Sequence, residues 1–206
     1  KYSLSSIVND KNISFSVKRE QRGLVSGYLF DEFAIGQEID VYYPRGHFTL
    51  EPSMQNTKPI VFITAGVAIS PTIAMVQEIQ TNPALSCRSV HFIHSARTRE
   101  YHAFRDVLQR LHLSDSNFKY YTAYSRDAPL DTVPQEPEAT EVRYGRLTEQ
   151  DLRDWLPAHR DAEVYFLGPV PFMASVKRAL VKIGVPPQQL HWEYKGSLDT
   201  IDSADL

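Results

Sequence analysis

A small-residue turn between a predicted strand and a predicted helix is the segment best suited to bind a phosphate group. The β-branched and aromatic run at residues 59–65 predicts a buried strand. Small residues follow at once, and Ser70 and Pro71 are residue types favoured at a helix N-cap and at the first helical position. Backbone N–H groups and the positive end of the helix dipole would face an anion there. The segment predicts a pyrophosphate site, with an ordinary tight strand–helix turn as the alternative.

A second turn of similar chemistry lies near the start of the chain. Gly23-Leu24-Val25-Ser26 follows a predicted strand and opens a short predicted helix, so its N–H groups could also hold a phosphate. Lys18 lies near the end of that strand, where a basic residue would favour an anion, although a solvated strand end would show the same residue.

The composition indicates a globular protein and excludes several kinds of site. The 206 residues are 42% hydrophobic and 11% aromatic, which suffices for one large or two small domains with an apolar core. The formal net charge of -3 argues against a general nucleic-acid binder. Cys87 is the single cysteine, so neither an internal disulfide nor a cysteine-ligated zinc or iron–sulfur site fits, and no histidine motif suggests another metal site. Without a signal peptide or an apolar run of about 20 residues, we expect a cytoplasmic protein that contacts no membrane.

The first quarter of the chain predicts β-structure. Residues 12–18 and 38–43 alternate apolar and polar side chains, as half-buried strands do. Between them, Leu29 and Phe33 lie four residues apart, as on one face of a helix. The polar residues 53–58 predict a linker. Because the opening residues have the pattern of a strand already under way, we expect the protein to begin earlier.

From residue 59 the pattern changes to alternating strands and helices, which predicts βαβ units and a parallel sheet. The proline-rich, acidic residues 127–141 interrupt this pattern and predict a solvated loop. Strands are expected at residues 59–65, 89–95, 118–124, 162–167 and 189–194, and helices at residues 71–81, 98–112, 148–156 and 170–184.

Segments in the same order and spacing as those of one known family cover nearly the whole chain. Residues 2–5 (YSLS) are similar to R-x-Y-S-[LV], residues 65–71 (AGVAISP) to A-G-V-G-I-T-P, and residues 165–173 (YFLGPVPFM) to Y-x-C-G-P-x-x-F-M. On these segments the chain resembles the ferredoxin–NADP reductase family, and within it the reductase part of flavohaemoglobins. Further similar segments lie at residues 23–26, 101–105, 145–148, 184–185 and 191–196.

The resemblance implies a β-barrel plus α/β fold, in which a partial antiparallel flavin-binding barrel is followed by a parallel-sheet pyridine-nucleotide-binding domain. We expect residues 1–53 to be the C-terminal part of the FAD-binding barrel domain and residues 54–206 to be the NAD(P)-binding α/β domain. The implied activity is that of a flavin-dependent NAD(P)H oxidoreductase, which passes hydride from NAD(P)H to FAD and electrons on to a haem or other acceptor. The cofactors would be FAD with NADPH or NADH, and the acceptor would be a globin-like haem domain or protein outside this chain.

The family's motifs imply roles for residues of this chain. Tyr2 would pack on the flavin ring and the Ser3 hydroxyl would bond the ring nitrogen that accepts hydride, so these two are the catalytic candidates. Arg97 would lie over the ribose of the nucleotide, where its guanidinium could take a 2′-phosphate with help from Arg99, which favours NADPH. The cofactor-binding residues expected in full are Tyr2, Ser3, Leu4, Ser5, Lys18, Gly23, Leu24, Val25, Ser26, Thr64, Gly66, Val67, Ala68, Ser70, Pro71, Ser95, Arg97, Leu167, Gly168, Pro169, Met173, Glu193 and Tyr194.

Departures from the family pattern keep other functions open. Ala68 replaces a glycine near the nucleotide diphosphate, Leu167 replaces a cysteine beside the hydride-transfer position, and Lys195 occupies an aromatic position that stacks on the flavin. One alternative is therefore a nucleotide- or flavin-binding protein on the same scaffold with lost or altered hydride transfer. Another is an FMN reductase of the phthalate dioxygenase type, against which counts the lack of any cysteine after Gly196.

Overall fold

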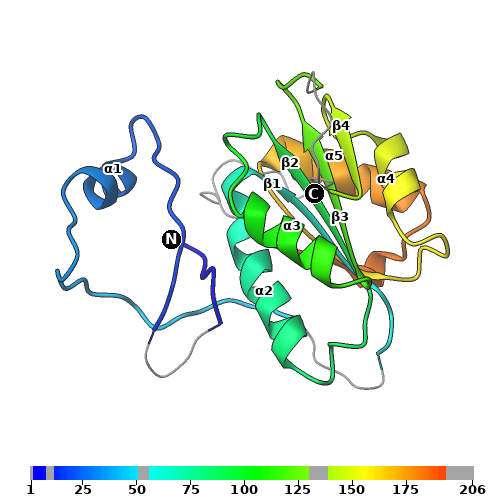
Figure 1. The fold of residues 1–206 in the computed structure, drawn as a ribbon, viewed down its shortest axis with the longest axis horizontal. Helices are drawn as coiled ribbons and strands as arrows, with labels where there is room; N and C mark the ends of the chain where they lie inside the picture. Colours follow the sequence, from blue (N-terminus) through cyan, green and yellow to red (C-terminus); the bar gives the residue numbers. More distant parts are fainter. Residues whose placement is uncertain (1, 8–11, 51–55, 130–138, 194–206) are drawn as a thin grey trace.

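The main feature of the fold is a six-stranded parallel sheet (Figure 1). The computed structural model describes residues 2–7, 12–50, 56–129 and 139–193. The strand order is β4-β3-β2-β1-β5-β6, and every neighbouring pair is parallel. The strands are β1 (Ile60–Ala65), β2 (Val90–Ala96), β3 (Phe118–Tyr124), β4 (Glu141–Tyr144), β5 (Glu163–Leu167) and β6 (Leu190–Trp192).

Helices cover both faces of the sheet, because each parallel connection needs a crossover. One face packs in an apolar cluster with α2 and α3, which lie in front of the sheet in Figure 1, and the other packs with α4 and α5. None of the helices in the described part of the chain combines the length and the apolar character needed to cross a bilayer. The helices are α2 (Ser70–Thr81), α3 (Arg105–Ser114), α4 (Glu149–Trp155) and α5 (Val170–Lys182), with the short 3₁₀ turns η1 (Gly66–Ile69) and η2 (Pro187–Gln189).

The central strand β1 shows why a continuous apolar run is needed. Ile60 and Phe62 join the cluster under α2 and α3, whereas Val61 and Ile63 join the cluster under α4 and α5. All four side chains are fully buried. Because successive residues of a strand face opposite sides, a strand that is covered on both faces must be apolar throughout. The predicted parallel α/β domain is confirmed.

Two elements of this domain differ from the prediction. Strand β4 is not among the predicted strands, and only its first residue, Glu141, lies in the stretch predicted as a loop. Because Glu141 and Arg143 are charged, the sequence does not have a strand pattern here, and the strand forms through parallel pairing with β3. Helix α3 begins at Arg105 rather than at residue 98. The preceding residues form turns, and Phe104 has a left-handed backbone with a φ of 60°, which a helix cannot include.

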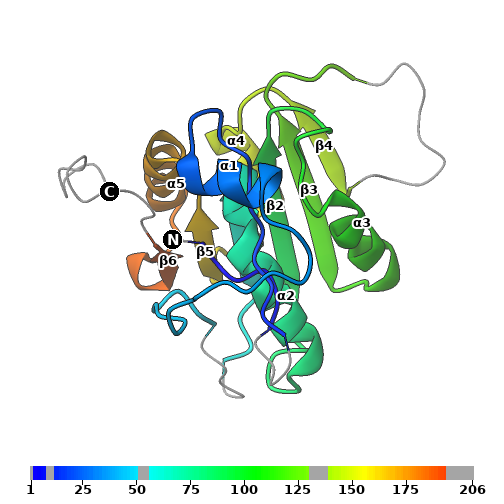
Figure 2. The same cartoon turned by 90° about the vertical axis from the view of Figure 1, so that its left-hand side faces the viewer.

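The N-terminal segment holds one helix, α1 (Leu24–Asp31), and one antiparallel bridge between Leu4 and Phe15. It lies apart from the sheet in Figure 1 and in front of it in Figure 2. The helix predicted near residue 29 is confirmed, but the strands predicted at residues 12–18 and 38–43 do not form among the described residues. An alternating pattern becomes a strand only where neighbouring strands supply hydrogen-bond partners, and here a single bridge does so.

Candidate functional site

The carboxyl ends of β1 and β5 meet where the strand order reverses direction. From β1 the chain continues to β2 on one side, and it returns as β5 on the other side only after β4. Thr64 pairs with Leu167, so the chain leaves the two strands side by side at Gly66 and Gly168. Ligands of open parallel sheets bind in the crevice outside such a switch point. The structure thus brings together two turns that the sequence predicts separately.

Gly168 lies where little space is left between the strand ends and α5. A Cβ built at this position would be 2.5 Å from Cδ1 of Phe172 and 3.1 Å from the Cβ of Ala65. Real side chains do not approach so closely, so glycine is required here for space. Helix α5 starts directly afterwards, with Pro169 at its N-cap.

Gly66 is required for its backbone conformation instead. Its φ is 59°, in the left-handed region, and a Cβ there would meet nothing within 4 Å. The residue opens η1, whose N-cap is Ala65. The first N–H groups of a helix have no acceptor inside it, so those of Gly66, Val67 and Ala68 are available to an anion.

Ser70 is not the N-cap that the sequence predicts. The helical backbone begins earlier, at Gly66, and the Ser70 hydroxyl donates to the carbonyl oxygen of Val67 at 2.9 Å. Pro71 does lie in the first turn of α2, as expected. The available N–H groups are therefore those at Gly66 and not those after Ser70.

The segment after β2 presents one free arginine and one engaged arginine. Arg97 is exposed, and among the described residues its guanidinium has no hydrogen bond or ion pair. Arg99 forms an ion pair with Asp127 at 3.2 Å, and its guanidinium lies over the rings of Tyr124 and Tyr144 at 4.9 and 5.3 Å. Of the two, Arg97 is the one available to a ligand.

A buried polar network lies beneath this edge, on the face that α2 and α3 cover. Thr64 Oγ1 hydrogen-bonds with His94 Nδ1 at 2.8 Å, and the His94 ring stacks on the His102 ring with centroids 4.3 Å apart. The two ring nitrogens of His102 each lie 2.9 Å from a hydroxyl, Nδ1 from that of Tyr124 and Nε2 from that of Tyr120. Burial lowers the pKa of His94 to about 3 and is the main cause that lowers the pKa of His102 to about 2. Both rings are therefore neutral at physiological pH.

This network is not predicted from the sequence, because its members are distant in the chain. A signal does exist: Thr64, His94 and Thr122 are each the fifth residue of a strand, and they pair in register across β1, β2 and β3. Polar residues at the same position of three neighbouring strands form a single row across the sheet. The Thr64 side chain belongs to this row and is fully buried, so it faces the network and not the crevice.

The remaining residues predicted at the nucleotide differ in how they can contribute. Leu167 and Met173 are buried and belong to the apolar cluster under α4 and α5. They can support the crevice through packing or through the backbone. Ser95 is partly buried at the end of β2, and Pro169 is exposed.

The residues predicted at the flavin ring lie at the start of the chain. Tyr2 is 44% exposed, and its ring centroid lies 5.8 Å from that of Phe15. Ser3 and Leu4 are partly buried, and Ser5 is buried. The bridge between Leu4 and Phe15 places these residues beside the segment that leads to α1.

The turn before α1 is shaped by Ser26. Its hydroxyl accepts from the N–H of Glu20 at 3.2 Å and donates to the carbonyl of Gly23 at 3.3 Å. A Cβ at Gly23 would come within 2.4 Å of that same hydroxyl oxygen, so the turn requires glycine. Leu24 and Val25 are exposed at the first turn of α1, where N–H groups lack helical acceptors.

Three further predictions concern the flavin side. Lys18 forms an exposed ion pair with Glu20 at 2.7 Å. Glu193 is the last residue that the structure describes, and Tyr194 and Lys195 lie outside the described residues.

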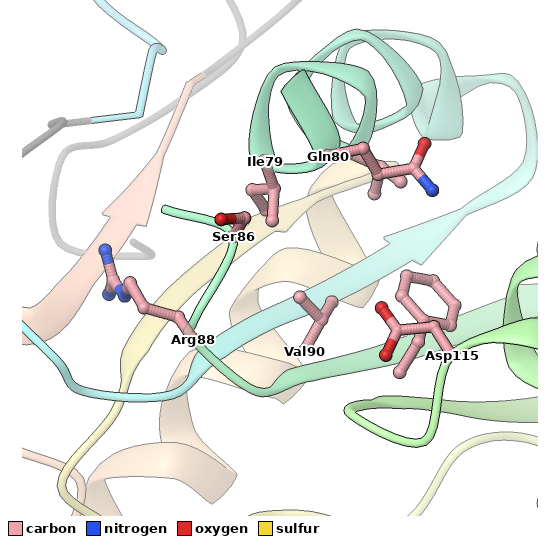
Figure 3. A pocket seen from close by; sticks show the side chains of 8 residues that line it. Ile79, Gln80, Ser86, Arg88, Val90 and Asp115 are labelled. Atoms are coloured by element: carbon pink, nitrogen blue, oxygen red, sulfur yellow. The ribbon is translucent and has the colours of Figure 1, made fainter. Parts of the chain in front are cut away.

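A pocket of about 210 Å³ lies at the opposite edge of the sheet (Figure 3). Val90 and Phe118, the first residues of β2 and β3, help to line it, together with Ser86 and Asp115. No residue predicted to bind a cofactor lines this pocket. The carboxyl edge remains the candidate site.

Comparison with known proteins identifies relatives of this chain. The family described as an oxidoreductase NAD-binding domain matches residues 62–178. A flavohemoprotein of Pseudomonas aeruginosa is 42% identical over 202 residues, which cover 98% of this chain and 48% of the relative. A flavohemoprotein of Burkholderia sp. is 41% identical over the same shares of the two chains. The chain thus spans about half the length of these relatives.

Solved structures show the same fold. The flavohem-like FAD/NAD-binding domain of nitric oxide dioxygenase from Vibrio cholerae has a TM-score of 0.76 and 26% identity, with 95% of this chain and 76% of that chain covered. A flavohemoglobin from Malassezia yamatoensis with bound FAD and heme has a TM-score of 0.66 at 20% identity, over 95% of this chain and 46% of that chain. The second likeness concerns the fold alone.

Proposed function

This chain belongs to the family of oxidoreductase NAD-binding domains, and on that premise we propose that it is the reductase module of a flavohaemoprotein. The module passes hydride from NAD(P)H to FAD and sends the electrons on to a haem acceptor. Residues 54–206 form the NAD(P)-binding domain, and residues 1–53 are the C-terminal part of the FAD-binding barrel domain. The acceptor would be a globin-like haem domain or protein outside this chain, which spans 48% of the Pseudomonas aeruginosa flavohemoprotein.

The observation that carries the proposal is the meeting of Gly66 and Gly168 at the switch point. Gly66 turns the chain so that the first N–H groups of η1 are available to an anion. Gly168 lets the end of β5 lie close to Ala65 and Phe172, because a Cβ would have no room there. A dinucleotide needs an anion-binding turn for its pyrophosphate, and it binds where the strand order of an open parallel sheet reverses.

The nucleotide would lie along the carboxyl edge of the sheet. We assign its pyrophosphate to Gly66, Val67 and Ala68, where Ser70 and Pro71 stabilise the turn. Its nicotinamide would contact Gly168 and Pro169, with Thr64, Leu167 and Met173 packed behind them. Its adenosine ribose would lie at Ser95 and Arg97, because the exposed Arg97 guanidinium has no partner among the described residues.

The N-terminal segment has a turn that fits flavin pyrophosphate. Gly23 allows the tight turn against Ser26, and the exposed first turn of α1 offers N–H groups and a positive helix end. Tyr2 and Ser3 would face the ring, and Leu4, Ser5 and Lys18 would flank it. Leu24, Val25 and Ser26 would hold the phosphates, and Glu193 and Tyr194 would close the far side of the ring. When bound, FAD would accept electrons as a pair and release them singly.

The alternative of a scaffold with altered hydride transfer rests on Ala68, Leu167 and Lys195, of which Lys195 lies outside the described residues. The Leu167 side chain packs in the apolar cluster, and Ala68 packs against the same cluster. Neither substitution fills the crevice with an exposed bulky group, which supports the reductase over the alternative.

The test is the visible absorption of the purified protein under anaerobic conditions, before and after NADPH and then NADH. A flavin absorption band that bleaches with either nucleotide supports the reductase. A protein that holds flavin but is reduced by neither nucleotide supports the alternative. A protein that retains no flavin when FAD is supplied contradicts the reductase and supports a nucleotide-binding protein on the same scaffold.

A further inference from the structure

The buried network beneath the nucleotide edge contains a histidine fixed at both ring nitrogens. His102 is 5% exposed, and each of its nitrogens meets a tyrosine hydroxyl at 2.9 Å. A neutral imidazole carries one donor and one acceptor nitrogen, so one tyrosine accepts from the ring while the other donates to it. The ring also stacks on His94. Its orientation is therefore set in three ways, which a residue that only fills space does not need.

His102 belongs to the segment of residues 97–104, which we call the ribose loop. This loop connects β2 to α3, and Arg97 is its first residue. The N–H of Tyr101 donates to the carbonyl of Thr98, and the N–H of His102 donates to that of Arg99, both at 3.2 Å. The loop is thus a series of tight turns, and His102 fastens it to the sheet.

The loop ends in a strained residue. Phe104 has φ 60° and ψ 14°, a left-handed conformation that is unfavourable for an aromatic side chain. Such strain persists only where the surrounding structure enforces it. The carbonyl of Phe104 accepts from the N–H groups of Val107 and Leu108, both at 3.1 Å, which joins the residue to the start of α3.

Tyr124 also holds the first half of the ribose loop, through Arg99. The ring of Tyr124 lies under the guanidinium of Arg99, and its hydroxyl bonds to His102. Asp127 accepts from the backbone N–H of Arg99 at 2.8 Å as well as from its side chain. The carbonyl of Arg97 itself accepts from the N–H of Arg126 at 2.8 Å. The backbone is therefore held by hydrogen bonds at Arg97 and at Arg99, while the Arg97 side chain stays free.

We propose that His102 is a positioning residue, which holds the ribose loop in a preformed shape so that Arg97 can bind the 2′-phosphate of NADPH. The proposal rests on the proposed function, because it places the adenosine end of the nucleotide at this loop. The new element is that the affinity for NADPH depends on His102, which does not contact the nucleotide. A loop that is already ordered loses little conformational freedom on binding, whereas a loosened loop must be ordered at the expense of affinity.

The variants Tyr124→Phe and Tyr120→Phe remove one bond to His102 each and keep the aromatic ring. Tyr121→Phe is the matched control, since Tyr121 lies on the same strand but faces the opposite side of the sheet, against Trp155. The probes are 2′,5′-ADP, measured by calorimetry, and NADPH, measured by steady-state kinetics on the flavin-loaded protein. Tyr124→Phe and Tyr120→Phe should each weaken 2′,5′-ADP binding and raise KM for NADPH by about tenfold, with kcat within about twofold. Tyr121→Phe should leave both unchanged.

The outcomes separate the two claims. If the unaltered protein binds 2′,5′-ADP and the two variants bind it equally well, the role of His102 is overturned and the proposed function stands. The role of His102 is likewise overturned if all three variants lose affinity in step with thermal stability, because that shows a general structural effect. If the unaltered protein binds neither 2′,5′-ADP nor NADPH but NADH reduces its flavin, the role of His102 is overturned and the proposed function stands. If neither NADPH nor NADH reduces the flavin, the proposed function itself fails. His102→Gln, which keeps one donor and one acceptor, should lie between the unaltered protein and the tyrosine variants.

Discussion

At the scale of single residues, the two glycines of the crevice are needed for different reasons. Gly168 must be small because Phe172 and Ala65 occupy the space that a Cβ would need. Gly66 has open space around it and must instead adopt a positive φ. The distinction matters for experiment, because a substitution at Gly66 changes the backbone without creating a clash.

We expect Gly66→Ala to cost about 1–2 kcal/mol of unfolding free energy, because an alanine is strained at this φ. It should also raise KM for NAD(P)H by about tenfold, since relaxation of the turn would move the N–H groups of η1. Steady-state kinetics and urea unfolding of the same preparation measure the two effects.

Gly184→Ala is the control for this substitution. Gly184 also has a positive φ, of 93°, and a methyl group added there would also meet nothing within 4 Å, but the residue follows α5 away from the crevice. The variant should lose similar stability and keep the KM of the unaltered protein. Equal KM values for the two variants would show that the Gly66 turn does not bind the nucleotide.

At the scale of elements, α4 illustrates a helix whose start is set by local bonds. Thr148 accepts from the N–H of Asp151 at 3.2 Å, and the Asp151 carboxylate accepts from the N–H of Thr148 at 2.8 Å, which together form a capping box. Thr148→Ala should therefore lower the unfolding free energy by about 1 kcal/mol in urea denaturation.

Thr81→Ala provides a comparison at the other end of a helix. The Thr81 hydroxyl donates to the carbonyl of Gln77 in the last turn of α2 and is exposed. This substitution should change stability by less than about 0.5 kcal/mol. A Thr148→Ala protein as stable as Thr81→Ala would mean that packing, and not the capping box, fixes the start of α4.

Elements with a strong local pattern could be predicted from the sequence, and those made by tertiary contacts could not. β1, β2, β3 and β5 are rich in apolar and aromatic residues because both faces of the sheet are covered. β4 carries charged residues at the sheet edge, and only its pairing with β3 makes it a strand. Residues 12–18 have the opposite property, since their alternation predicts a strand that lacks neighbours among the described residues.

The same reasoning applies to the candidate site. Gly66 and Gly168 could be found because a turn between strand and helix leaves a local mark in the sequence. The contacts among Thr64, His94 and His102 could not, because they depend on the register of strands and on the path of the ribose loop. Ser70 has the residue type of a cap, yet the 3₁₀ turn before it places the start of the helical backbone earlier.

At the scale of the whole molecule, the buried histidines make stability depend on pH. The pKa of His94 is lowered to about 3 and that of His102 to about 2, so the unfolded chain binds protons near pH 6 that the folded chain does not. Stability therefore falls as the pH falls from about 7.5, by about 1.4 kcal/mol per histidine at pH 5.5. His91, whose pKa burial also lowers, acts in the same direction. Urea unfolding at pH 7.5 and at pH 5.5 measures the total change in the free energy of unfolding.

One variant isolates the contribution of His102 to the pH dependence of stability. His102→Gln should lose less stability between these two pH values than the unaltered protein, because one buried neutral histidine is gone. The carboxylates with lowered pKa, such as Glu149 beside Lys182 and Arg153, lose their contribution at a lower pH than this window. An equal loss in both proteins would show that the His102 site is protonated in the folded state.

The strand order also governs how the protein can be made. β1 is synthesised first and pairs with β2 soon after, but its other neighbour, β5, begins only at Glu163. At about 5–20 residues per second, a ribosome takes roughly 5–20 s to bridge that interval. During this time the most apolar strand of the nascent chain has one unpaired edge, which is the kind of surface that aggregates or recruits chaperones. The crevice that would receive the nucleotide is thus absent until β5 has been translated, so a product interrupted before Glu163 cannot bind nucleotide there.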